Sequence, residues 1–374
     1  MRIERLRLFR VRLPLVHGFE TSSHRKSEID HVLVEATDAD GAVGWGEIAT
    51  PADPYYCSET TDGAWTTAVR HLAPAALGTP WETPEQLEQA WARVRGHEFA
   101  KAGFSIAVWD LYARAGGRSL AGALGGTRTT VSAGVSLGIE ADVDALLAQV
   151  QRQVDAGYTR VKLKIAPGWD VVPVRAVRSA HPGVALHVDA NGAYPDTAAS
   201  TEVFRALDRE GLTMIEQPYT PRDFLAHARL QAQLDTPLCL DESVVEIADL
   251  QTMLALDAGR VLNIKVSRMG GLTQARRAHD VAKDAGVPVW CGGMHEFGVG
   301  RAANVALSSL PGFTLPSDVS GSDKYYARDV VVPPVVARGG QVPVPTEPGL
   351  GHRVDTPWLH EIATERFDTA AVAR

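Results

Sequence analysis

The feature of this sequence that most constrains its fold is a strand–helix repeat that begins near residue 129. Short β-branched or apolar runs alternate from there with longer segments of helical pattern, which predicts a parallel sheet. Eight such units in about 200 residues suit a (β/α)8 barrel. A doubly wound sheet is disfavoured because no glycine-rich turn of dinucleotide-binding type follows a predicted strand. The predicted strands are 131–136, 160–165, 185–190, 213–216, 237–241, 261–266, 287–291 and 313–315, and the clearest helices are 141–156, 197–210, 246–256 and 271–285.

The segments on either side of this repeat are irregular. Residues 1–128 mix predicted strands (3–13 and 31–36, the second followed by a turn at Asp40-Gly41) with helices (63–72, 84–95 and 100–115). Residues 326–374 are rich in proline and glycine. We therefore expect an α+β capping domain over 1–128, a barrel domain over 129–325, and a C-terminal segment, 326–374, that packs back on the cap.

Polar residues recur at one position of the repeat. Lys164, Asp189, Glu216, Asp241 and Lys265 are separated by 25, 27, 25 and 24 residues, about one strand–helix unit each. All five then lie at the carboxyl ends of successive strands, where barrel enzymes assemble their active sites. A single acid at a strand end can equally cap the next helix, but five in register predict a shared site.

The three acids of this set predict a metal site. Carboxylates from neighbouring strands that converge without a cation would repel one another, whereas all-oxygen ligation suits Mg²⁺ first and Mn²⁺ second. Asn191 points the same way as Asp189 and is either a ligand-binding residue or a buried structural amide. Glu242 directly follows Asp241, and we expect it behind the metal ligands rather than among them.

The stretch VKLKIAPG carries two lysines on one face of a predicted strand, because side chains alternate along a strand. Alone, it is typical of a solvent-exposed edge strand. The acids in register favour a catalytic interpretation instead. Lys162 would then favour the neutral form of Lys164, which could remove a proton α to a metal-bound carboxylate. Lys265 is four strands away and would face the substrate from the opposite side.

Composition excludes several partner classes. The 374 residues carry a net charge of -8 without a dense basic block, so we expect neither nucleic acid nor an anionic membrane surface as partner. No apolar run approaches the ~20 residues of a membrane-spanning helix. Cys57, Cys239 and Cys291 are far apart and odd in number, which favours free thiols in a cytoplasmic protein.

The strand-end residues resemble those of the enolase superfamily, specifically its muconate lactonizing enzyme subgroup. The similarity covers nearly the whole chain. FETSSH, GWGE, PYYCSETT, AKAGFSIAVWDL, VKLKIAPGWD and GGMHEFGVGRAANVALSSLPGFTLPSD look like the o-succinylbenzoate synthase and N-succinylamino acid racemase family. This resemblance implies metal-dependent syn dehydration of a succinyl-hydroxycyclohexadiene carboxylate in menaquinone synthesis. It also implies that the same site could racemise N-acylated amino acids.

The resemblance implies roles for individual residues. Lys164 would act as base and then as acid in the dehydration, while Lys265 would stabilise the enediolate; in racemisation the two would be opposed acid and base. Arg268 matches an arginine of racemase-active members, although a salt bridge at the barrel rim is an alternative. The residues expected to line the pocket for the succinyl or acyl arm are Phe19, Tyr55, Ser136, Gly293 and Met294.

Departures from the family pattern and rival activities also follow from the sequence. His295 stands at a position that is usually aliphatic, and Ser23-His24 replaces Phe-Gly in a lid loop; both concern specificity. Racemisation as the main activity is the first alternative. Dipeptide epimerisation is disfavoured because only Asp318 matches the Asp-x-Asp expected after strand eight. Muconate cycloisomerisation and a non-catalytic binding barrel are further alternatives. The family implies a homo-oligomer, a dimer or an octamer.

Overall fold

A parallel sheet of seven strands forms the centre of the protein. The computed structural model describes residues 1–22 and 24–372. The seven strands follow one another in space in their sequence order, and each pairs in parallel with the next. They are β5 (Val135–Leu137), β6 (Arg160–Lys164), β7 (Ala185–Asp189), β8 (Ile215–Glu216), β9 (Leu238–Leu240), β10 (Val261–Ile264) and β11 (Val289–Cys291).

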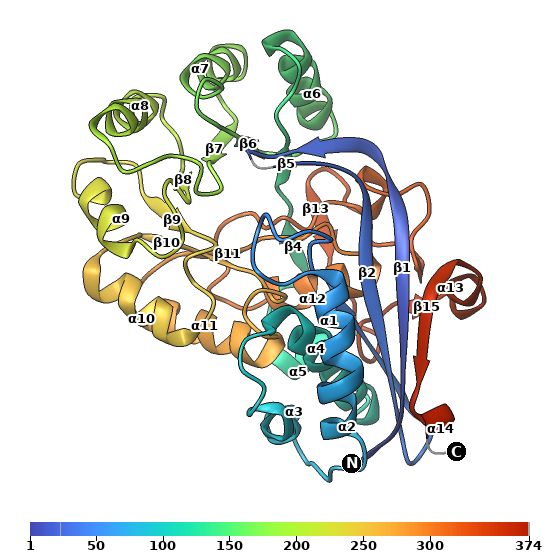
Figure 1. Ribbon diagram of the computed structural model, residues 1–374. Helices are drawn as coiled ribbons and strands as arrows, with labels where there is room; N and C mark the ends of the chain where they lie inside the picture. The colour runs from blue at the N-terminus through green and yellow to red at the C-terminus, as the bar shows by residue number, and fades with distance from the viewer. Residues whose placement is uncertain (23, 373–374) are drawn as a thin grey trace.

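Helices follow the strands and cover the outside of the sheet (Figure 1). They are α6 (Val143–Asp155), α7 (Val171–Ala180), α8 (Ala198–Asp208), α9 (Phe224–Gln231), α10 (Ile247–Leu256), α11 (Leu272–Asp284) and α12 (Gly298–Ser308). Helix α6 shows why these segments are helical. Asp142 caps its first turn by accepting a hydrogen bond from the Ala145 amide at 2.8 Å, and Leu146 and Val150, one turn apart, are buried. The predicted alternation of strands and helices is confirmed.

The eighth predicted strand, 313–315, is wrong as a full strand. Within it, Phe313 makes an isolated parallel bridge with Val289 of β11, and Ser317, two residues beyond it, makes another with Ala133 just before β5. Thr314 instead donates its amide to the Gly312 carbonyl in a tight turn, and Pro316 has no amide hydrogen to donate to a ladder. The bridges nevertheless bring the two ends of the curled sheet toward each other.

The N-terminal segment and one C-terminal strand form a separate antiparallel sheet in the order β15-β1-β2-β3. Its strands are β1 (Ile3–Glu20), β2 (Arg25–Asp38), β3 (Val43–Ile48) and β15 (Ala363–Asp368). Helix α4 (Glu98–Ala115) packs on β3 through glycines: a Cβ added at Gly46 would lie 1.9 Å from the Gly103 carbonyl oxygen. β1 and β2 are longer than predicted, and their paired ends reach the mouth of the parallel sheet (Figure 1).

The C-terminal end returns to the N-terminal sheet. β15 pairs antiparallel with β1, and Arg5 forms an ion pair with Asp368, so both ends of the described chain lie together (Figure 1). The remaining elements are α1 (Thr61–Thr67), the π-helix Ala68–Leu72, α2 (Ala73–Ala76), α3 (Pro84–Glu88), the 3₁₀ helices Gln89–Trp91 and Ser322–Lys324, α5 (Leu120–Leu124), β4 (Thr130–Ser132), β12 (Val331–Val332), β13 (Gln341–Pro343), β14 (Arg353–Val354), α13 (Thr356–Ile362) and α14 (Thr369–Val372).

Within the described residues, no helix combines the length and apolarity needed to cross a bilayer. The three cysteines are free thiols there, as predicted; Cys239 and Cys291 are buried and Cys57 is partly exposed.

Candidate active site

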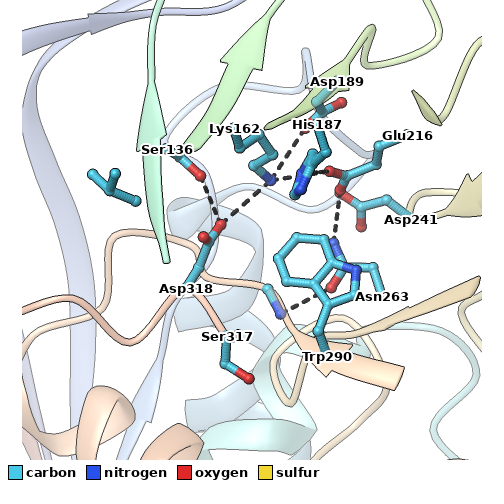
Figure 2. A network of polar contacts seen from close by, with 12 residues as sticks. Ser136, Lys162, His187, Asp189, Glu216, Asp241, Asn263, Trp290, Ser317 and Asp318 are labelled. Carbon is cyan, nitrogen blue, oxygen red and sulfur yellow. Dashed lines mark hydrogen bonds and ion pairs between the residues drawn. The ribbon is translucent and has the colours of Figure 1, made fainter. Parts of the chain in front are cut away.

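The three predicted metal ligands converge at one end of the parallel sheet. Asp189 ends β7, Glu216 ends β8, and Asp241 follows β9 directly. One oxygen from each carboxylate lies within 4.8 Å of the other two, and all three side chains are fully buried. Figure 2 shows these carboxylates facing one another. Three buried oxygen donors at this separation fit a hard divalent cation, because they supply the charge and the ligand type that such an ion prefers.

Each of these carboxylates also has a lysine partner. Lys164 Nζ donates to Asp189 Oδ2 at 2.5 Å, and Lys265 Nζ donates to Asp241 Oδ2 at 2.8 Å. Burial alone would lower the pKa of Lys265, but the Asp241 carboxylate raises it above its ordinary value. Burial would likewise raise the pKa of Asp241, yet Lys265 and Arg268 hold it below its ordinary value. The negative charge of the acids is therefore balanced by the adjacent ammonium groups.

Lys162 is the centre of a buried ionic network (Figure 2). Its Nζ lies 3.1 Å from Glu216 Oε2 and 3.3 Å from both Asp189 Oδ2 and Asp318 Oδ2, and it lies 4.7 Å from the centre of the Trp290 ring. Burial would lower the pKa of Lys162, but these carboxylates raise it well above its ordinary value. These carboxylates therefore hold Lys162 in its cationic form beside the predicted metal site. The predicted influence of Lys162 on Lys164 stays a prediction.

A cavity of about 140 Å³ opens between Lys164 on β6 and Lys265 after β10; we call it the lysine cavity. Five other residues proposed from the sequence for substrate binding line it, and so does Glu242. Glu242 Oε1 accepts a hydrogen bond from Asn191 Nδ2 at 2.8 Å, and burial raises the pKa of Glu242 to about 8. The lining residues are Phe19, Thr21, His24, Lys26, Tyr55, Tyr56, Lys164, Asn191, Pro221, Glu242, Lys265, Gly293, Met294 and His295.

Ser136, a predicted pocket residue, and Arg268, matched to an arginine of racemase-active members, lie outside the lysine cavity. Ser136 lines an adjoining cavity of about 50 Å³, where its hydroxyl donates to Asp318 Oδ2 at 2.8 Å. Arg268 is buried behind Asp241, with which it forms an ion pair, and its Nε donates to the Val244 carbonyl at 2.9 Å. The Arg268 guanidinium therefore contacts a predicted metal ligand instead of the substrate cavity, because the turn after β10 directs it inward.

The departures noted in the sequence lie at the mouth of this cavity. His295 lines it and makes an edge-on contact with Phe19, whose ring centre is 4.6 Å away. Burial, together with nearby Lys26, holds the pKa of His295 well below its ordinary value. His24 also lines the cavity, 5.6 Å from the ring of Tyr55. Ser23 lies outside the described residues.

Several site residues were missed in the sequence. Tyr56 donates its hydroxyl to Asp241 Oδ1 at 2.9 Å and accepts from Lys265 Nζ at 3.1 Å. Asn263 Nδ2 donates to Glu216 Oε1 at 2.8 Å, which fixes that carboxylate from β10, two strands away in the sheet. Asn263 could have been predicted as a site residue, since it is a polar residue inside a predicted strand two positions before Lys265. Tyr56 could not have been predicted in this way, because nothing in the neighbouring sequence distinguishes it from Tyr55.

Models of known protein families match both parts of the chain. Residues 4–125 match the N-terminal domain of mandelate racemase and muconate lactonizing enzyme, and residues 145–358 match the enolase C-terminal domain-like family. The first range contains most of β1, all of β2 and β3 and the helices that follow them, and the second contains β6 to β11 with the three predicted metal ligands.

Curated proteins and solved structures are similar over nearly the whole length. The chain is 44% identical over 353 residues to an o-succinylbenzoate synthase of Geobacillus kaustophilus, covering 94% of each protein. It is 45% identical over 367 residues to an N-succinylamino acid racemase of Amycolatopsis, covering 98% of this chain and 99% of the relative. An enolase superfamily member from Listeria innocua superposes with a TM-score of 0.94 at 36% identity, covering 98% and 99% of the two chains. The muconate lactonizing enzyme of Pseudomonas fluorescens superposes with a TM-score of 0.92 at 26% identity, covering 97% of this chain and 99% of that one.

The family models, the relatives and the strand-end geometry agree. The chain belongs to the enolase superfamily, within the mandelate racemase and muconate lactonizing enzyme family.

Proposed function

We propose that this protein is an o-succinylbenzoate synthase that eliminates water from a succinyl-hydroxycyclohexadiene carboxylate. One observation carries the proposal: two lysines from opposite strands border one cavity beside three buried carboxylates. The o-succinylbenzoate synthases of Geobacillus kaustophilus and Bacillus subtilis, at 44% and 40% identity, support this choice of substrate. The reaction would belong to cytoplasmic menaquinone synthesis.

Residues of the chain would perform the proton transfers. Lys164 would remove the proton α to the substrate carboxylate and return a proton to the departing hydroxyl, so that water leaves and the ring becomes aromatic. Lys265, held as a cation by Asp241, would stabilise the negative charge that develops on the substrate. Asp189, Glu216 and Asp241 would hold Mg²⁺, which when bound supplies positive charge for the substrate carboxylate. Mn²⁺ is expected to substitute.

Racemisation of N-succinylamino acids is a second candidate function. It is favoured by the placement of both lysines on the same cavity from strands β6 and β10, since racemisation needs an acid and a base on opposite faces of one carbon. The Amycolatopsis racemase at 45% identity supports it as well. Dipeptide epimerisation ranks lower, because Asp318 is buried and already paired with Arg160 at 2.7 Å, so it is poorly placed to bind a dipeptide amino group.

The experiment supplies purified protein and Mg²⁺ with the cyclohexadiene substrate and follows formation of the aromatic product by absorbance. A parallel assay follows exchange of the α-proton of N-succinylamino acids in deuterated water by NMR. We expect dehydration, with or without exchange. If dehydration is absent while exchange is fast, the racemase is the correct function; if both are absent with the cation bound, both proposals fail.

Variants at the lysines test the assigned roles. We expect Lys164→Ala and Lys265→Ala to abolish both reactions, while Lys283→Ala, an exposed lysine on α11, leaves them unchanged. Full turnover by Lys164→Ala would contradict its role as the base. The predicted dimer or octamer is checked by light scattering on the same preparation.

A further inference from the structure

Lys26 is a third lysine at the lysine cavity, and the mechanism above does not use it. It lies at the start of β2, where its backbone pairs with Phe19 of β1, another cavity residue. Pairing within this long hairpin fixes where the Lys26 side chain begins and directs it to the cavity that Lys164 and Lys265 border. The protein therefore places a further cation at its substrate cavity.

The three lysines differ in their partners. Lys164 and Lys265 each donate to a carboxylate of the predicted metal site, at 2.5 and 2.8 Å. The Lys26 ammonium makes no hydrogen bond or ion pair with the residues that the structure describes; Asp53 is a nearby carboxylate, but it does not form an ion pair with it. Partial burial without such a partner is unfavourable for a cation, and it lowers the pKa of Lys26 to about 8.

Most of the other groups that surround Lys26 in this cavity are neutral or cationic. Burial and the adjacent Lys26 charge lower the pKa values of His24 and His295, so both imidazoles are neutral near pH 7. Phe19 and Met294 add apolar surface to the same lining. Glu242 is the carboxylate in this lining, and Asn191 is hydrogen-bonded to it. At this end of the cavity, the Lys26 ammonium is thus a cation without an ion-pair partner among the described residues.

We infer that Lys26 binds a second carboxylate of the substrate, at the end of its acyl arm, and so selects succinyl over uncharged arms. The inference rests on the proposed function, because it takes the first carboxylate to lie at the metal site. A carboxylate at Lys26 would gain a charge-assisted hydrogen bond in a partly buried site, where such bonds are strong. Lys26 would act on specificity and take no part in proton transfer.

A binding experiment tests this without relying on turnover. We compare o-succinylbenzoate with 2-butanoylbenzoate, whose arm lacks the terminal carboxylate, by calorimetry in the presence of Mg²⁺. We expect the intact protein to bind the dicarboxylate about 10-fold more tightly or better, the effect of one charge-assisted bond. Lys26→Gln should abolish this preference, Lys26→Arg should keep most of it, and Lys283→Gln should leave it unchanged. Equal affinities of the intact protein for the two ligands would overturn the inference.

Turnover separates failure of the inference from failure of the proposed function. With N-succinyl and N-acetyl forms of one amino acid, Lys26→Gln should raise KM for the succinyl substrate alone, with kcat nearly constant. An equal effect on both substrates would overturn the inference while leaving the proposed function intact. The inference would also be overturned if Lys26→Gln raised KM for substrates with an acidic amino acid side chain, whichever acyl arm they carry. Absence of turnover with both substrates and with the cyclohexadiene would contradict the proposed function, and the calorimetry would still decide the role of Lys26.

Discussion

Replacing Lys162 by methionine should destabilise the metal-free protein and make it more dependent on a divalent cation. Lys162 Nζ contacts Glu216 Oε2 at 3.1 Å and lies 3.3 Å from Asp189 and Asp318, all of them buried. Methionine keeps the apolar contact with Trp290 but removes the charge, so the three carboxylates lose a shared partner. Removing one partner of a buried ion pair costs about 3–5 kcal/mol.

The size of the thermal shift follows from the length of the chain. Unfolding entropy is about 2.1 cal/mol/K per residue near 60 °C, which for 374 residues amounts to roughly 0.8 kcal/mol/K. A loss of about 3–5 kcal/mol should therefore lower Tm by about 4–6 °C in a chelator. Mg²⁺ should restore part of this loss, because a cation bound by Asp189 and Glu216, two of these acids, replaces the missing charge.

The assay is differential scanning fluorimetry of the intact protein, Lys162→Met and the surface control Lys283→Met, each with chelator and with a Mg²⁺ series. We expect the Mg²⁺-induced rise in Tm to be larger for Lys162→Met than for the intact protein, since one ammonium group no longer competes for the carboxylates. A Tm equal to that of the control, or an identical Mg²⁺ response in all three proteins, would refute the electrostatic reasoning.

Three further predictions concern the metal site, a buried acid and the packing of the cap. Mg²⁺ should raise Tm of the intact protein but not of Asp189→Ala, which removes one of three ligand carboxylates; an equal rise in both would place the ion elsewhere. Burial raises the pKa of Glu88 from 4.5 to about 7, so between these pH values the folded chain binds more protons than the unfolded chain, and its stability falls as pH rises. Glu88→Gln should therefore have a higher Tm than the intact protein, by a difference that is small at pH 5 and grows up to about pH 7. A difference that does not depend on pH would contradict this. Gly46→Ala should prevent cooperative folding, as measured by circular dichroism, because its Cβ would lie 1.9 Å from the Gly103 carbonyl oxygen, whereas Gly183→Ala, with open space around it, should not.

Much of the fold could be predicted because the strand–helix repeat can be recognised in the order of apolar and polar residues along the chain. Apolar runs at regular spacing gave seven of the eight strands, since each must bury its side chains on both faces of a covered parallel sheet. The prediction of a strand at 313–315 was wrong because the apolar pattern does not reveal that Gly312 and Pro316 favour turns over hydrogen-bonded strand pairing. β1 was predicted too short because Pro14 and Gly18 interrupt its strand pattern, and β2 because charged residues such as Lys26 and Glu28 hide its start.

Some contacts of the candidate site follow from the strand–helix repeat, and others do not. Lys164 with Asp189, and Lys265 with Asp241, are pairs between neighbouring strands about one unit apart in sequence. Tyr56 is 185 residues from Asp241 and reaches it from the N-terminal segment, so no local pattern could predict that hydrogen bond.

The spacing of residues along the chain is enough to place particular side chains at the ends of the strands, because the length of the strand–helix unit brings residues 24–27 positions apart to the same edge of the sheet. The pairing of the charges emerges only on folding: Lys162 is shared among three acids, Arg268 lies behind Asp241, and Lys26 lies at the cavity without an ion-pair partner among the described residues. Pairing depends on distances of a few ångströms and on burial, which arise where the β1–β2 hairpin and Tyr56 meet residues of the parallel sheet at the lysine cavity.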